Sequence, residues 1–172
     1  KAAFEAMPPE FKAIESSPTI TRAQLAALIG TRLADLVKRA PRRSTAVITD
    51  TRGNWANAWI IPVARAGFMD VNANYTFQPN ARVTRGDLAH TVSQVLTVIA
   101  SNNPALAAQL KNTRRRFPDV PAGHLRARAA AMAVEAGVMQ PLENDTFQLA
   151  RPVTGAEAVA VVDRLASLAG SR

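Results

Sequence analysis

Two arginines stand where a side chain could bind an anion, because each directly follows a threonine that opens an apolar helical pattern. Arg22 lies in Ile20-Thr21-Arg22-Ala23-Gln24, and Arg85 lies in Val83-Thr84-Arg85-Gly86-Asp87. A threonine at the N-cap fixes the next residue at the first helical position, beside free N–H groups and the positive end of the helix dipole. A guanidinium there suits a carboxylate. The alternative is structural: the stem packs on a neighbouring segment and the charge pairs with an acid.

Two tryptophans are a second set of candidates. Trp55 and Trp59 could each stack on a sugar face and donate a hydrogen bond, or fill the core instead. The histidines, His90 and His124, have no metal-ligand or catalytic spacing. We interpret His90 as a surface or half-buried structural residue and His124 as a polar group at a helix N-terminus. With no cysteine and no glycine-rich phosphate loop, the sequence predicts a protein that is not an enzyme and uses no metal or cofactor.

The element that positions both arginines occurs three times. Thr21, Thr84 and Thr154 each follow a β-branched apolar residue, and each is followed three places later by Gln24, Asp87 or Glu157. This is the capping-box pattern of a helix start, and three copies indicate an internal repeat. The third copy has Gly155 where the other two have arginine.

Sliding the chain by 70 residues places 55–92 over 125–162 without a gap. Ala-Gly, Met, Asn and Thr-Phe-Gln recur at equal places, and Asp50 and Asp119 each open the polar stretch that precedes a copy. Residues 1–19 show no matching landmarks. We therefore expect the chain to begin inside a repeat of a longer protein.

The ordered string resembles an S-layer homology repeat. Its landmarks in one copy are Asp50-Thr-Arg-Gly-Asn-Trp55, Ala66-Gly67-Phe68-Met69, Thr76-Phe77-Gln78-Pro79 and Val83-Thr84-Arg85. A second copy has Phe117-Pro118-Asp119-Val120-Pro121 with His124, then Gly137-Val138-Met139, Thr146-Phe147-Gln148 and Pro152-Val153-Thr154, and residues 20–24 resemble the end of a first.

The resemblance implies a mainly α fold, a pseudo-threefold bundle of helix-loop-helix repeats with short irregular or extended connections. It also implies a non-catalytic module outside the cytoplasmic membrane, in the cell envelope, periplasm or cell surface, that binds a wall-linked, often anionic glycan or peptidoglycan. In the family, the arginine after the threonine contacts the ligand in a groove between repeats. The candidate glycan-binding residues are Arg22, Arg85, Trp55, Trp59, Asn74 and Gln78, and the structural caps are Thr21, Thr84 and Thr154. Leu125 and Gly155 depart from the pattern in the last copy.

We expect one compact domain made of 1–43, the end of a first repeat; 44–100, a second; 101–116, an inserted helix and basic linker; and 117–172, a third. Helices are predicted at 22–38, 55–66, 85–100, 104–111, 126–136 and 155–169 from their apolar periodicity, caps and terminal glycines. Pro62 predicts a kink or a later start in the second of these. Short extended pieces are predicted at 46–49 and near each Thr-Phe-Gln.

The net charge of +8 favours an anionic partner, and no segment is apolar for long enough to insert in a membrane. The clusters Lys38-Arg39 with Arg42-Arg43 and Arg114-Arg115-Arg116 could be solvated helix ends or phosphate contacts. We do not expect nucleic acid as a partner, since neither an aromatic platform nor a reading helix accompanies them. The leading hypothesis is attachment of a larger surface or outer-membrane protein to a wall glycan. The alternatives are contacts with other envelope proteins or copies of itself, and polyanion binding through charge alone.

Overall fold

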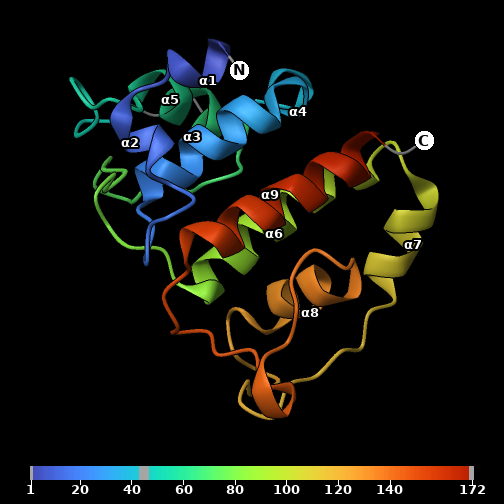
Figure 1. The fold of residues 1–172 in the computed structure, drawn as a ribbon. Coiled ribbons are helices and arrows are strands. Elements are labelled where there is room, and N and C mark those ends of the chain that lie inside the picture. The colour runs from blue at the N-terminus through green and yellow to red at the C-terminus, as the bar shows by residue number, and fades with distance from the viewer. Residues whose placement is uncertain (1, 43–46, 171–172) are drawn as a thin grey trace.

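The computed structural model describes residues 2–42 and 47–170, and its fold is mainly α, as predicted (Figure 1). The helices are α1 (Ala2–Glu5), α2 (Pro9–Lys12), α3 (Arg22–Arg32), α4 (Ala34–Arg39), α5 (Asn57–Arg65), α6 (Arg85–Ala100), α7 (Pro104–Lys111), α8 (Ala127–Glu135), the short 3-10 turn η1 (Glu143–Asp145) and α9 (Gly155–Gly170). Within the described ranges no helix combines the length and hydropathy needed to cross a bilayer.

The repeated threonines begin the three helices that carry the core. Thr21 and Gln24 form a full capping box at α3, and Thr84 and Asp87 form one at α6. At α9 the Thr154 hydroxyl accepts from the Glu157 backbone N–H at 3.1 Å, while the Glu157 carboxylate turns to another repeat. The local pattern of the sequence therefore sets where each of these helices starts.

Several predicted bounds need correction. The helix expected over 22–38 is interrupted at Leu33, whose φ of −118° and ψ of 32° are not helical, and continues as α4. The helix expected from Trp55 begins at Asn57, in line with the later start that Pro62 predicted, and Pro62 lies inside it. The four-residue helices α1 and α2 were not foreseen, because so short a stretch shows no periodicity.

The connections between helices are irregular, and the described residues form isolated bridges in place of strands. Three of their backbone hydrogen bonds close a ring: Ile20 N–H donates to Val153 O, Val83 N–H to Ile20 O, and Val153 N–H to Val83 O. The ring ties the three residues that precede the capping threonines to one another.

Ala46, the first residue of the extended piece predicted at 46–49, lies outside the described residues.

The buried side chains of all the repeats form one hydrophobic cluster. Helix α3 packs on α5 and α6 packs on α8, while α9 contacts both α3 and α6. Figure 1 shows α6 and α9 side by side through the middle of the molecule. The three capped helices thus converge on one core, as their single apolar stripes require. The pseudo-threefold arrangement of whole repeats stays a prediction.

Candidate functional site

Arg22 begins α3 and reaches the second repeat. Its Nε donates to the Phe77 carbonyl at 2.8 Å and its Nη2 to the Asp70 carbonyl at 2.6 Å. The guanidinium carbon lies 4.3 Å from the centre of the Phe77 ring. Burial lowers the pKa of Arg22, and nearby carboxylates oppose that shift, so the side chain keeps its charge. Nη1 has no hydrogen-bond partner among the described residues, which leaves one edge of the guanidinium for a ligand.

Arg85 repeats this geometry at the start of α6, but its third edge is occupied. Nε donates to the Phe147 carbonyl at 2.8 Å and Nη2 to the Gln140 carbonyl at 2.7 Å, while Nη1 pairs with the Glu157 carboxylate. The residue is only 1% exposed. Burial lowers its pKa, and the Glu157 carboxylate offsets only part of this shift. Such a satisfied, enclosed guanidinium holds the third repeat against the second.

The loops that receive these arginines are themselves held by a repeated aspartate. The Asp50 carboxylate accepts from the Phe77 and Gln78 N–H groups at 2.7 and 2.8 Å. Asp119 does the same for Phe147 and Gln148, at 2.9 and 2.8 Å. The sequence predicted these aspartates only as landmarks of the repeat. The signal that could have revealed their role is their similar distance from the phenylalanine that follows, 27 residues in one copy and 28 in the other.

The Asp119 contacts have an electrostatic consequence. Burial acts to raise the pKa of Asp119, but backbone N–H donors, those of Phe147 and Gln148 foremost, and the Arg85 charge outweigh it and hold the pKa below its ordinary value. The carboxylate is therefore more stable as an anion in the folded chain than in the unfolded one.

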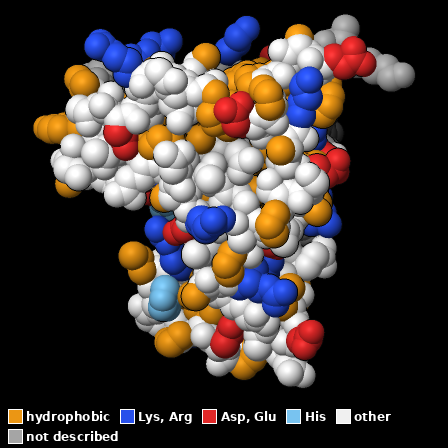
Figure 2. Space-filling model, turned by 60° about the vertical axis from the view of Figure 1, so that its left-hand side comes forward, with side chains coloured by type: hydrophobic (Ala, Val, Ile, Leu, Met, Phe, Trp, Pro, Cys, Tyr) orange, Lys and Arg blue, Asp and Glu red, His pale blue; other side chains and the backbone are white. Residues whose placement is uncertain are grey.

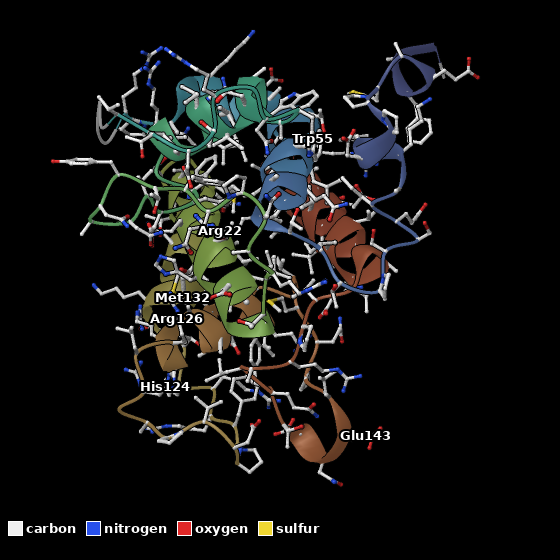
Figure 3. All side chains as sticks on the ribbon, turned by 90° about the vertical axis from the view of Figure 1, so that its left-hand side faces the viewer. Arg22, Trp55, His124, Arg126, Met132 and Glu143 are labelled. Atoms are coloured by element: carbon white, nitrogen blue, oxygen red, sulfur yellow. The ribbon has the colours of Figure 1, made fainter. Side chains whose placement is uncertain are left out.

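A polar pocket of about 300 Å³ opens beside Arg22. Arginines from each of the three predicted repeats line it: Arg22, Arg82 and Arg126. Gln78 lines it as well, with a left-handed φ of 58° that turns the loop. In Figure 3 Arg22 lies near the middle of the molecule, with Arg126 below it. The pocket thus has an arginine from each predicted repeat in its lining, and the Arg82 guanidinium also bonds the Thr19 hydroxyl.

The acids of this pocket already have partners inside the fold. The Asp70 carboxylate lies 2.7 Å from His90 Nε2, and the Asp87 carboxylate closes the α6 capping box. His90 is thus a half-exposed wall residue with an acidic partner. Figure 2 shows Lys and Arg side chains across the waist of one face, with only a few acidic side chains among them. A pocket of this composition suits an anionic, hydroxyl-rich ligand.

Position 155, which corresponds to Arg22 and Arg85 in the third repeat, has no room for a side chain. A Cβ on Gly155 would lie 1.6 Å from the Ile14 carbonyl oxygen, and the Gly155 N–H donates to Ser17 O at 2.9 Å. The segment before α3 therefore crosses the position where the other copies carry arginine. This close approach explains why glycine replaces arginine there.

The tryptophans lie outside the pocket and half-buried against the core. Trp59 packs directly on Gly30, where an added Cβ would lie 2.6 Å from the Trp59 Cδ1 atom. Its ring centre lies 6.2 Å from those of Phe11 and Trp55. Trp55 stands beside α3, away from Arg126 (Figure 3). Leu125, at the place that corresponds to Trp55, is 85% exposed. The pair thus forms part of an aromatic row between α5, α3 and the N-terminal helices.

The remaining candidates stabilise loops. The Asn74 side chain accepts from the Thr76 hydroxyl at 2.6 Å, outside the pocket. His124 Nδ1 accepts from the Arg126 N–H at 3.0 Å, as the Asn54 side chain does from Ala56 at 2.9 Å. Asn54 and His124 therefore act as polar groups before α5 and α8, respectively.

Metal binding finds no support in the part of the chain that the structure describes, where no three His, Asp or Glu side chains gather. Arg43, the last residue of the basic cluster Lys38-Arg39 with Arg42-Arg43, lies outside the described residues.

A comparison with curated proteins finds no match. A family model for the S-layer homology domain matches residues 47–89 and 116–159, together half of the chain. Each match spans one helix, α5 or α8, then a Phe-Gln loop held by an aspartate, and the start of a capped helix, α6 or α9. S-layer homology domains are generally modules that anchor proteins to the cell envelope by binding cell-wall polymers, occur in cell-surface proteins and are not a catalytic family. With both matched copies arranged around shared capped helices, the chain belongs to the S-layer homology domain family.

Proposed function

We propose that this chain attaches a larger envelope protein to a wall-linked, anionic glycan through the pocket beside Arg22. One observation carries the proposal: guanidinium groups from three repeats line one pocket, and Nη1 of Arg22 has no partner among the described residues. A carboxylate on a sugar would accept from that edge, while Gln78 offers an amide to the neighbouring hydroxyl groups.

The other candidate residues divide by position. Arg85 is enclosed by Glu157 and the third repeat, so we assign it to holding the repeats together. Trp55, Trp59 and Asn74 lie outside the pocket, and we assign them to the fold as well. Arg82 and Arg126 join Arg22 and Gln78 as proposed ligand contacts.

Purified wall sacculi provide the test. The chain should sediment with intact sacculi and stay in solution once the wall polysaccharide has been removed. Arg22→Ala should lose sedimentation, while Arg52→Ala, which removes the same charge from an exposed position outside the pocket, should keep it. Arg22→Lys should restore it only in part, because lysine keeps the charge but not the planar fork.

Two outcomes would contradict the proposal. Undiminished binding to stripped sacculi would mean that the chain binds the peptidoglycan itself and not the attached polysaccharide. Equal loss for Arg22→Ala and Arg52→Ala, together with a steep fall in binding as salt rises, would indicate attraction by charge alone.

A further inference from the structure

A second pocket lies where the third repeat begins and shares no lining residue with the pocket beside Arg22. It measures about 200 Å³. Four arginines contribute to its walls: Arg114, Arg115, Arg116 and Arg128. The last of these comes from α8, and the others come from the segment that joins α7 to the third repeat.

Two buried polar atoms at this pocket have no partner among the described residues. They are the Thr113 hydroxyl oxygen and the Arg115 Nε. Thr113 is 7% exposed, so water in the bulk solvent does not reach its hydroxyl freely. Leaving a buried donor unpaired carries its full desolvation cost, and native folds rarely tolerate it without a ligand or an ordered water.

The charges at the pocket are unbalanced. Arg115 pairs with Asp145, and its guanidinium carbon lies 5.0 Å from the centre of the Phe117 ring. Among the described residues, no acid lies within ion-pair distance of the three other arginines. Arg114 and Arg128 donate to the Thr113 and Leu110 carbonyls, which leaves their charges unpaired. Only one of the four arginines that line the pocket thus has a carboxylate partner, and this excess of positive charge favours an anion.

The second repeat lacks this chemistry. Ala58 occupies the place of Arg128 in the second repeat, and Ile48 occupies the place of Phe117. The pocket is thus not a copy of the groove that the repeats share.

We infer that this pocket binds a phosphate monoester group. Several guanidinium donors and a hydroxyl approach from different segments, which suits three terminal oxygens better than the two coplanar oxygens of a carboxylate. The volume lies below the roughly 300–1,000 Å³ of pockets that enclose whole organic ligands, so the phosphate enters and the group that bears it stays outside. A phosphorylated sugar and a lipid headgroup both offer this group.

The test is an NMR titration of the isotope-labelled 172-residue chain with inorganic phosphate and with glucose 1-phosphate, against chloride at equal ionic strength. The Thr113 amide and the Arg115 Nε signals should shift and saturate. Arg128→Gln and Thr113→Val should each weaken binding about tenfold. Arg52→Gln, which removes an equal charge elsewhere, should change the affinity by less than about twofold.

Thr113→Val also separates binding from folding. Valine has the same shape without the unpaired hydroxyl, so the variant should unfold at the same temperature as the parent or higher while binding phosphate less tightly. Arg22→Ala should leave phosphate binding unchanged, so failure here and failure of the glycan proposal are distinguishable.

Sedimentation with phosphatidic acid vesicles, set against phosphatidylcholine vesicles, identifies the source. Binding to the acidic vesicles indicates a lipid headgroup, and tighter binding of glucose 1-phosphate than of inorganic phosphate indicates a sugar; either supports the site. Shifts that never saturate, equal losses for Arg128→Gln and Arg52→Gln, or an unchanged affinity in Thr113→Val would overturn it.

Discussion

Replacing Arg85 by alanine tests what the repeated arginine does when it is fully enclosed. The change removes donors to the Phe147 and Gln140 carbonyls and leaves the Glu157 carboxylate without its partner. Breaking a buried ion pair costs about 3–5 kcal/mol. Because the Glu157 side chain is 26% exposed and can regain water, we expect the lower end, about 3 kcal/mol.

Arg22→Ala is the matched control. It removes the equivalent donors, those to the Phe77 and Asp70 carbonyls, from a side chain that is only partly buried. Water can replace those contacts there, so we expect a loss of about 1–2 kcal/mol.

Urea unfolding followed by circular dichroism measures both variants. With a slope of about 2 kcal/mol per molar urea, Arg85→Ala should lower the midpoint by about 1.5 M and Arg22→Ala by about 0.5–1 M. Equal losses in the two variants would refute the reasoning, because burial and the Glu157 pair would then add nothing.

Three further changes test the supports of the site. Thr84→Ala removes a cap and should cost about 1 kcal/mol, or about 2–4 °C in the melting midpoint; an unchanged midpoint would mean that the cap is dispensable. Gly155→Ala forces a Cβ onto the Ile14 carbonyl and should cost at least about 1–3 kcal/mol, whereas Gly123→Ala, where a Cβ meets nothing within 4 Å, should cost little. Asp119 has a pKa below its unfolded value of about 3.9, so its stabilisation is present above that pH and is lost as the pH falls through the folded pKa. The stability gap between the parent and Asp119→Asn should therefore shrink from pH 7 towards pH 2, and a gap independent of pH would contradict this role.

The parts of the fold that the sequence predicted are those with local causes. Threonine caps predicted the starts of α3, α6 and α9, and α7 has the bounds 104–111 that were predicted for it. The structure adds that the Asn103 side chain accepts from the Leu106 N–H at the start of α7. Gly67 and Gly137 terminate α5 and α8 with φ angles of 80° and 76°.

The features that escaped prediction depend on contacts between distant residues. The pairing of Arg85 with Glu157 spans 72 positions, so the sequence could not distinguish an enclosed arginine from an open one. The crossing of Ile14 over Gly155 also depends on the packing of the first repeat against the third. The local capping pattern placed Arg22 and Arg85 at equal positions, and tertiary structure then made them unequal.

The most direct measurement of the central claim is the dissociation constant of the chain for solubilised acidic wall glycan, by calorimetry at about 0.15 M salt, where bare charge is screened. Arg22→Ala should weaken binding about tenfold or more, since it removes a charge-assisted contact, while Arg52→Ala should stay within about twofold of the parent. A folded Arg22→Ala variant that binds the glycan as tightly as the parent would contradict the assignment of the pocket.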